Sequence, residues 1–224
     1  MGGGVAEALA GRGCGVVLTW RTHPEAAEET AASLRKAGGK AAAWRCDVSR
    51  DAQVMSLMRK ISKGFGRLDI LVHLASIYET SGREGSFGRH LDANVRGAYG
   101  VSRAAAALMN RAGRIVLISD WTSASGRPRY REYSAYYVSK VAVKGIAEAL
   151  ALELAPRILV NAIAPGPILP PEGIARAEYD AVKKATPLGR WGGVEEIVKA
   201  VLFMIETDFV TGETIRVDGG RHLY

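Results

Sequence analysis

Tyr136 and Lys140, whose side chains can exchange protons, lie four positions apart in an Ala-rich stretch with the pattern of a helix. On a helix, residues at this spacing share one face and lie one turn apart. A phenol ordinarily has a pKa near 10, and an ammonium group within about 4–6 Å favours the phenolate and lowers that pKa. The pair predicts a general acid/base that works near neutral pH. The alternative is a Tyr and a Lys on a solvated helix face, and only the surrounding sequence can separate the two.

The elements that would position this pair alternate along the chain. Apolar runs of strand length occupy 15–20, 41–46, 69–75, 114–119, 158–164 and 214–217. Helical patterns occupy 4–10, 24–37, 51–64, 87–110, 134–155, 174–185 and 194–206. Continuous apolar strands separated by helices predict an α/β fold, a doubly wound parallel sheet with helices on both faces. In such folds ligands bind beyond the carboxyl ends of the strands, so we expect the functional residues there.

Length and composition favour one compact domain of 224 residues with a sizeable core. No run approaches 18 uninterrupted apolar residues, and the N-terminus lacks the basic region of a signal peptide, so we expect no membrane span and a cytoplasmic location. Cys14 and Cys46 lie at or beside predicted strands without metal-ligand spacing, which indicates packing residues in a reducing compartment. No metal site is predicted.

The net charge of +7, from 30 basic and 23 acidic residues, raises the question of nucleic acid. However, the Lys and Arg residues are scattered, with no basic run and no interleaved aromatic residues. An anionic cofactor or substrate fits such a charge equally well. We therefore expect a small-molecule substrate and no nucleic-acid partner.

The start of the chain differs from an ordinary dinucleotide-binding fold. Gly2, Gly3 and Gly4 precede a helical pattern and could let a pyrophosphate approach the backbone at a helix N-terminus. No strand precedes them, and a sheet without that strand would leave backbone groups unpaired at its centre. We expect that residues upstream are missing or that another segment fills the gap. A flexible glycine tail is the alternative for Gly2 and Gly3, but it does not account for the strand.

Several motifs occur in the order found in the short-chain dehydrogenase/reductase family, which the chain resembles over essentially its whole length. They are VAEALAGRG at 5–13, CDVS at 46–49, LDILVHLAS at 68–76, LDANVRG at 91–97, YxxxK at Tyr136/Lys140, NAIAPGPI at 161–168, PLGRWGGVEEI at 187–197 and TGETIRVDGG at 211–220. Each motif alone is weak evidence, whereas the full series in order is strong evidence. The resemblance implies a Rossmann fold with a nicotinamide cofactor, and a homo-oligomer, a tetramer or a dimer.

The resemblance also implies the residues of the cofactor site: Gly2, Arg21, Thr22, Asp47, Val48, Ala75, Ser76, Tyr136, Lys140, Pro165, Gly166 and Ile168. The choice of cofactor follows from charge. An acidic residue after the second strand would hold the ribose hydroxyls of NAD, whereas an Arg accommodates the 2′-phosphate of NADP. Here Arg21 and Thr22 follow that strand, and no carboxylate appears until Glu25. NADPH is therefore predicted, unless Arg21 is an ordinary surface charge.

The mechanism that the resemblance implies is hydride transfer from the nicotinamide to a carbonyl or imine carbon. Tyr136 would donate the proton, and Lys140 would lower the Tyr136 pKa and bind the nicotinamide ribose. Asn94 would hold a water that relays protons from Lys140. The segment 165–174 is a candidate lid, or else a rigid surface crossover. The alternative function is a non-catalytic or impaired NADP-binding protein, a redox sensor or a product disabled by its N-terminus.

One position departs from the family pattern, which usually has a Ser after the fifth strand to bind the substrate carbonyl. Asp120 stands there, and an ionised carboxylate would oppose the negative charge that a reacting carbonyl oxygen gains. The pteridine reductase-like branch also carries Asp here, and ASIYET at 75–80 is similar to its sequence; the chain also resembles the 3-oxoacyl-ACP reductase-like branch. A pterin or another nitrogen heterocycle is therefore a candidate substrate. Ser123, thirteen residues before Tyr136, or Ser125 could take the role instead, but we favour Asp120 because it follows the strand directly.

Overall fold

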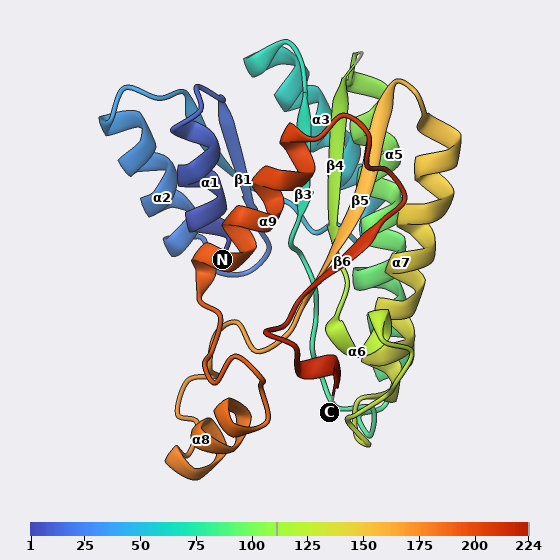
Figure 1. The fold of residues 1–224 in the computed structure, drawn as a ribbon. Helices are drawn as coiled ribbons and strands as arrows, with labels where there is room; N and C mark the ends of the chain where they lie inside the picture. Colours follow the sequence, from blue (N-terminus) through green and yellow to red (C-terminus); the bar gives the residue numbers. More distant parts are fainter. Residues whose placement is uncertain (111, 224) are drawn as a thin grey trace.

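Six parallel strands form the centre of the molecule in the computed structural model, which describes residues 1–110 and 112–223 (Figure 1). The strands are β1 (Val16–Trp20), β2 (Ala41–Arg45), β3 (Ile70–His73), β4 (Gly113–Ile118), β5 (Ile158–Pro165) and β6 (Thr214–Val217). Every pair of neighbours is parallel. Because parallel strands need crossover connections, helices cover both faces of the sheet. The predicted α/β class is confirmed.

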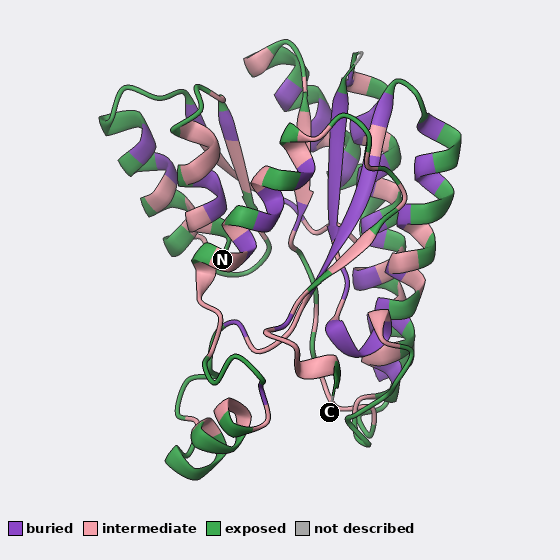
Figure 2. Cartoon of the chain, viewed as in Figure 1, coloured by how far each residue is buried: buried purple, intermediate pink, exposed green. Residues whose placement is uncertain are grey.

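Helices form a layer on each side of the strands. On one side lie α1 (Gly2–Ala10), α2 (Glu25–Lys36) and α9 (Val194–Glu206), and on the other α3 (Asp51–Phe65), α5 (Gly97–Leu108) and α7 (Ser134–Leu154) (Figure 1). Successive residues of β4 face opposite layers, as a strand requires. Ile115 and Leu117 pack with α3, α5 and α7, whereas Val116 packs with α1 and α9. Figure 2 shows this central burial.

The strands fall into two separate sheets. One has the order β1–β2 and the other β3–β4–β5–β6, and no strand within 1–110 or 112–223 lies between β1 and β3. Helix α1, which begins at Gly2, packs on α2 and α9 and so bridges the two sheets. This division lies where the sequence predicts that a strand is missing.

The prediction of one continuous helix over 87–110 is wrong, because a π-helical turn interrupts it. The structure has α4 (Ser86–His90), a π-helical turn (Leu91–Arg96) and then α5. Such π-helical turns are frequent at functional sites, and this one contains the buried residue Asn94. At this turn the Asn94 side chain forms hydrogen bonds with Ile77 and Ser139, which are described below.

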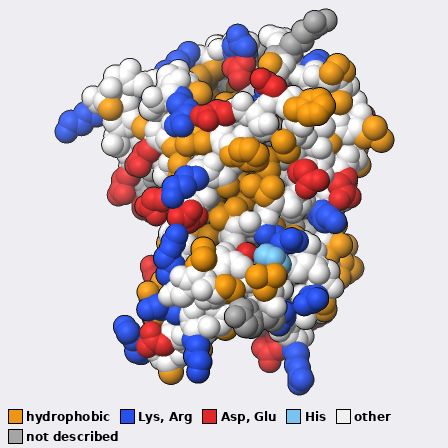
Figure 3. All heavy atoms as spheres, viewed as in Figure 1, with side chains coloured by type: hydrophobic (Ala, Val, Ile, Leu, Met, Phe, Trp, Pro, Cys, Tyr) orange, Lys and Arg blue, Asp and Glu red, His pale blue; other side chains and the backbone are white. Residues whose placement is uncertain are grey.

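The remaining elements lie beyond the carboxyl ends of the strands. They are α6 (Trp121–Ala124), α8 (Arg176–Lys184) and a 3₁₀ turn (Arg221–Leu223), and Figure 1 shows them at one end of the sheet. Figure 3 shows Lys and Arg side chains dispersed among Asp and Glu over the visible face, without a single basic patch on that face. No helix in the described part of the chain has the length and apolar character needed to span a bilayer.

Candidate active site

Helix α7 places Tyr136 and Lys140 on one face, as their spacing predicts. The Lys140 ammonium lies 5.6 Å from the centre of the Tyr136 ring. Lys140 is buried, with 3% of its surface exposed, and its Nζ donates a hydrogen bond of 2.9 Å to the Ile118 carbonyl at the end of β4. The pair therefore lies against the carboxyl end of a central strand and not on a solvated helix face.

Asp120 is the third polar group at this position. Tyr136 Oη donates to Asp120 Oδ2 over 3.3 Å. The other carboxylate oxygen, Oδ1, accepts from the Thr122 backbone N–H at 2.8 Å and from the Thr122 hydroxyl, so Asp120 caps the N-terminus of α6. Capping fixes the carboxylate with one oxygen turned toward Tyr136.

The alternative hydroxyls are bound elsewhere. Ser123 Oγ lies 2.8 Å from Ser119 Oγ and donates to the Asp120 carbonyl oxygen at 2.8 Å. Ser125 Oγ donates to the Trp121 carbonyl oxygen at 2.6 Å. Of the three candidates, the structure brings Asp120 to the Tyr136 hydroxyl, whereas Ser123 and Ser125 hold the short helix α6 together.

The electrostatics of the phenol differ from the sequence-based expectation. Burial raises the pKa of Tyr136 above its ordinary value, and the negative charge of Asp120 raises it further. Burial also lowers the pKa of Lys140 to about 8, against the opposing effect of Asp120. The predicted lowering of the Tyr136 pKa by Lys140 is therefore wrong in this structure, because desolvation and a nearby carboxylate outweigh the ammonium. The phenol is set up to hold its proton at neutral pH.

Asn94 is buried beside this group, with 1% of its surface exposed. Its Oδ1 accepts from the Ile77 backbone N–H at 2.7 Å, and its Nδ2 donates to the Ile77 carbonyl oxygen and to Ser139 Oγ, each at 3.0 Å. Ser139 Oγ in turn donates to the Tyr136 carbonyl oxygen at 2.6 Å. Asn94 thus joins the segment after β3 to the first turns of α7, the helix that also carries Lys140.

An aromatic wall of three tyrosines adjoins the Tyr136 ring. Tyr78 stacks on Tyr133 with 4.3 Å between ring centres and 6° between planes, and it meets Tyr136 edge-on at 4.7 Å. Tyr130 meets Tyr133 edge-on at 6.2 Å. Sequence reasoning did not predict that these rings stack on one another. The position of Tyr78 shortly after β3, at the carboxyl end of a strand, was the available signal.

The predicted cofactor residues of the first half of the chain lie after successive strands. Arg21 and Thr22 follow β1 and are exposed, and Ala75 and Ser76, also exposed, follow β3. Asp47 follows β2, and its Oδ1 accepts from the Ser49 N–H at 3.0 Å and the Ser49 hydroxyl at 2.7 Å. Burial opposes ionisation of Asp47, but these hydrogen bonds and the charge of Arg21 lower its pKa overall. Arg21 and Asp47 therefore belong to one neighbourhood.

Two other predicted cofactor residues lie toward the gap between β1 and β3. Gly2 begins α1, and a Cβ on it would lie 3.8 Å from Leu74 Cδ1. Val48 packs against α5, where a Cβ on Gly97 would lie 2.8 Å from Val48 Cγ2. A side-chain carbon at Gly2 would therefore meet Leu74 at ordinary contact distance, whereas Val48 already packs tightly against the start of α5.

The turn after β5 is built on close backbone approach. Pro165 ends β5, and a Cβ on Gly166 would lie 2.5 Å from Asp218 Cβ, which only glycine avoids. Ile168 is buried with 6% of its surface exposed. The turn therefore requires glycine at position 166, because the backbone at the end of β6 lies too close for a side chain.

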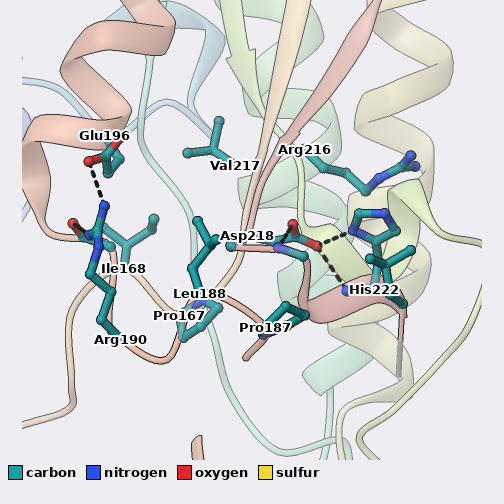
Figure 4. Close-up of a pocket in the computed structure, with 14 residues that line it drawn as sticks. Pro167, Ile168, Pro187, Leu188, Arg190, Glu196, Arg216, Val217, Asp218 and His222 are labelled. Atoms are coloured by element: carbon teal, nitrogen blue, oxygen red, sulfur yellow. Dashed lines mark hydrogen bonds and ion pairs between the residues drawn. The ribbon is translucent and has the colours of Figure 1, made fainter. Parts of the chain in front are cut away.

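Beside this turn lies a cavity of about 530 Å³ (Figure 4). Asp218 accepts from His222 Nδ1 at 2.7 Å and from the His222 backbone N–H at 3.1 Å, which ties the C-terminal turn to the end of β6. Arg190 pairs with Glu196 on the other side. Sequence reasoning missed the Asp218–His222 pair. The residues that line the cavity are Pro167, Ile168, Pro187, Leu188, Arg190, Gly192, Glu196, Arg216, Val217, Asp218, Gly219, Gly220, His222 and Leu223.

Comparisons with known proteins agree with this geometry. The sequence model of a family described as Enoyl-(Acyl carrier protein) reductase matches residues 1–222. An uncharacterised oxidoreductase of Methylorubrum extorquens is 35% identical over 98% of this chain and 92% of its own length. A short-chain dehydrogenase/reductase from Serratia marcescens superposes with a TM-score of 0.91 at 32% identity, covering 99% of this chain and 93% of that one.

A further solved structure carries a cofactor. The FolM alternative dihydrofolate reductase 1 from Brucella suis, in complex with NADP, superposes with a TM-score of 0.89 at 28% identity, covering 98% of this chain and 90% of that one. Together, the matched family, the relatives and the Rossmann-like sheet identify the chain as a member of the short-chain dehydrogenase/reductase family of oxidoreductases.

Proposed function

We propose that this protein is an NADPH-dependent reductase of a small carbonyl or pterin-like heterocyclic substrate, with Tyr136 as the proton donor. The observation that carries the proposal is the cluster of Tyr136, Lys140 and Asp120 at the carboxyl end of β4. Asn94 supports the cluster from the π-helical turn. Titratable groups with shifted pKa values at the carboxyl end of a parallel sheet are typical of an active site.

The preference for NADPH is supported by the residues after β1. Arg21 and Thr22 are exposed there, and the first carboxylate after β1 is Glu25, which begins α2. A guanidinium can bind a phosphate through two parallel hydrogen bonds, whereas a ribose without the phosphate offers it no charge. The NADP complex of the Brucella suis protein is consistent with this choice. When bound, the cofactor supplies the hydride.

The chain's own residues would handle the proton and the orientation. Tyr136 keeps its proton at neutral pH because burial and Asp120 raise its pKa, so its hydroxyl acts as an acid toward the substrate. Lys140 is charged below about pH 8 and would bind the ribose through its remaining donors, since one donor is used by Ile118. Asn94 would hold the relay water of the proposed mechanism, with its amide oriented by Ile77 and Ser139.

The substrate class is argued from Asp120 and the aromatic wall. A carboxylate accepts hydrogen bonds from ring N–H groups, but it opposes an oxygen that gains negative charge. The stacked pair of Tyr78 and Tyr133 offers aromatic surface beside the Tyr136 ring, on which a flat heterocycle can stack. These features favour a pterin-like ring over an aliphatic ketone. The name of the Brucella suis relative points in the same direction.

A substrate panel with NADPH tests the proposal. We expect oxidation of NADPH with dihydropterins, followed by absorbance at the nicotinamide band, and weaker or no turnover with simple ketones and sugars. Turnover of ketones alone would reject the pterin assignment and keep the reductase. Turnover of no substrate with NADPH bound would favour the alternative, a non-catalytic or impaired NADP-binding protein.

The alternative function has one specific observation in its favour, the division of the strands between β1 and β3. Fluorescence titration with NADPH tests the cofactor site before turnover is compared: a blue shift or quenching shows binding, and its absence in a folded sample removes the enzyme function for this chain. Our proposal also includes a single domain, a homo-oligomer and a cytoplasmic location, the last supported by the free cysteines Cys14 and Cys46.

A further inference from the structure

Three arginines from three different segments of the chain gather around the short helix α6. Arg129 lies in the loop after that helix, Arg216 lies in β6, and Arg221 begins the C-terminal 3₁₀ turn. Both β6 and the C-terminal turn pack against α6, which directly follows the carboxyl end of β4. These three residues form the arginine cluster, which lies at the same end of the sheet as the candidate active site.

Trp121, the first residue of α6, brings two of these guanidinium groups to one ring. The guanidinium carbon of Arg129 lies 5.8 Å from the centre of the Trp121 ring, and that of Arg221 lies 5.9 Å from it. The face of an indole attracts a cation at this distance. Trp121 is buried, with 5% of its surface exposed, so the ring that both guanidinium groups contact is fixed in the fold.

Arg216 completes the cluster from β6. Its Nη1 donates a hydrogen bond of 3.2 Å to the carbonyl oxygen of Ala124, the last residue of α6. Arg216 is exposed and also lines the cavity of about 530 Å³, where Figure 4 shows its side chain beside His222. Positive charge therefore lies at both ends of α6.

No carboxylate in residues 1–110 or 112–223 forms an ion pair with the arginine cluster, although many other arginines of that part of the chain are paired. Asp120 and Asp218 are close to the cluster in the chain, but their oxygens have other partners. Asp120 accepts from Thr122 and Tyr136, and Asp218 accepts from His222. Like charges that the protein itself does not offset attract an anionic ligand.

The aromatic wall leads from the Tyr136 ring to the arginine cluster. Its last ring, that of Tyr130, meets the stacked pair of tyrosines edge-on. Burial raises the pKa of Tyr130, and the charge of Asp120 raises it further. The charges of Arg221 and Arg129 oppose that rise, so both lie within electrostatic reach of the Tyr130 hydroxyl. One end of the wall thus adjoins the proton donor, and the other end adjoins two cations.

The arginine cluster is separate from the residue expected to bind the cofactor phosphate. Arg21 follows β1, which pairs with β2 in a sheet of its own, whereas Arg216 belongs to β6, at the end of the other sheet. Figure 1 shows α6 and the C-terminal turn away from β1 and α2. An anion at the cluster is therefore not the 2′-phosphate that Arg21 would bind.

We propose that the arginine cluster binds an anionic group of the substrate, a carboxylate or a phosphate, at the end of the molecule that does not react. Guanidinium groups bind such anions through paired N–H donors. Arg221 uses its Nη1 to donate to the Val182 carbonyl oxygen at 3.2 Å, which holds the side chain and leaves its other donors for a ligand. The substrate is then a flat ring with an acidic tail that lies along the aromatic wall. This assignment rests on the proposed function, because it takes Tyr136 as the reacting end.

Binding of matched probes tests the charge preference without turnover. One pair is pterin-6-carboxylate and 6-methylpterin, which share a ring and differ in charge. The other pair is naphthalene-2-carboxylate and its neutral carboxamide, whose flat rings lack N–H groups. Dissociation constants come from calorimetric titration of the full chain at pH 7, with and without saturating NADP⁺. We expect the carboxylate of at least one pair to bind at least about tenfold more tightly than its neutral partner, because hydrogen bonds to charged groups are the stronger ones.

Substitutions assign the preference to the cluster. The double variant Arg129→Gln/Arg221→Gln removes two charges and should bring the affinity ratio within that pair to about twofold or less. Arg131→Gln is the matched control, because it removes an exposed charge from the same loop, and it should keep the wild-type ratio. Arg129→Gln alone changes an exposed residue and should lower the ratio at least about threefold, which decides the matter if the double variant unfolds. NADP⁺ affinity should stay within about twofold in every variant.

Equal affinities within both pairs would overturn the proposal, as would a ratio that survives in the folded double variant or falls equally far in Arg131→Gln. Loss of NADP⁺ binding in the folded double variant would also overturn it, because the cluster would then serve the cofactor. The proposed function fails separately. A charge preference without turnover of any substrate keeps the anion site and removes the reductase, and a preference within the naphthalene pair alone keeps the site and counts against a heterocyclic substrate.

Discussion

The Asp120 carboxylate lies 3.3 Å from the Tyr136 hydroxyl and accepts its hydrogen bond. This contact couples the two groups that the family resemblance assigns to substrate binding and proton transfer. A negative charge at this distance disfavours the phenolate, and burial disfavours it further. The acidity of the Tyr136 phenol therefore depends on Asp120.

Removal of the Tyr136 hydroxyl should abolish turnover and leave cofactor binding in place. We expect Tyr136→Phe to reduce kcat by about 10²–10⁴-fold, the usual contribution of a general acid. NADPH affinity, measured by fluorescence titration, should stay within a factor of about two. Tyr137→Phe, the neighbouring half-buried tyrosine, is the matched control and should retain activity. Unchanged turnover in Tyr136→Phe would remove this residue from the mechanism.

Asp120→Asn should move the alkaline limb of the pH profile. Loss of the negative charge lowers the pKa of Tyr136 toward its ordinary value, so activity that needs the protonated phenol should decline at a lower pH than in the wild type. The measurement is kcat/KM against pH with a fixed substrate. Ser123→Ala is the control, because its hydroxyl bonds Ser119 and the Asp120 backbone. A larger effect of Ser123→Ala than of Asp120→Asn would exchange the two assignments.

Arg21→Asp should reverse the cofactor preference. The variant places a carboxylate after β1, which repels a 2′-phosphate and can accept from the ribose hydroxyls. We expect the ratio of NADPH to NADH affinity to fall at least about tenfold, or roughly 1.4 kcal/mol. Lys36→Asp makes the same charge change at the exposed end of α2 and should leave the ratio unchanged. Equal shifts in both variants would show that only net charge matters.

His73 should make the fold sensitive to acid. Burial lowers its pKa from 6.5 to about 4, and the charge of Lys140 acts in the same direction. Between these values the unfolded chain binds a proton that the folded chain does not, so stability is full above about pH 6.5 and declines toward pH 4. The loss amounts to about 3 kcal/mol. Urea unfolding at pH 7 and pH 4.5 should show a smaller difference for His73→Asn than for the exposed control His23→Asn.

Gly166→Ala should destabilise the turn after β5. Its Cβ would lie 2.5 Å from Asp218 Cβ and 2.6 Å from Asp218 Cα, so one backbone segment must move. We expect a loss of about 1–3 kcal/mol of unfolding free energy, together with weaker NADPH binding. Gly145→Ala in α7 is the control, because a Cβ there meets nothing within 4 Å and alanine favours a helix. Destabilisation of both variants to the same degree would exclude the close approach as the cause.

The order of helices and strands could be predicted from the sequence, because apolar runs of strand length alternate along the chain with stretches of helical periodicity. The Tyr136/Lys140 face and the placement of Asp120 after β4 followed from the same periodicity. The sign of the Tyr136 pKa shift was not predictable, since it depends on burial and on a carboxylate sixteen residues away in sequence. The stacking of Tyr78 on Tyr133 could not be predicted either, because it depends on the conformations of two loops that are far apart in the sequence.

The π-helical turn at Leu91–Arg96 makes the length of its helix part of the site. A π turn holds one residue more than an α turn, and each residue of a regular helix rotates its side chain by about 100°. Deletion of a single residue just before Asn94 would therefore leave every polar group of the cluster in the sequence and yet swing the amide away from Ile77 and Ser139. In a homologue that keeps this asparagine but is one residue shorter here, the asparagine side chain would point away from the positions of Ile77 and Ser139.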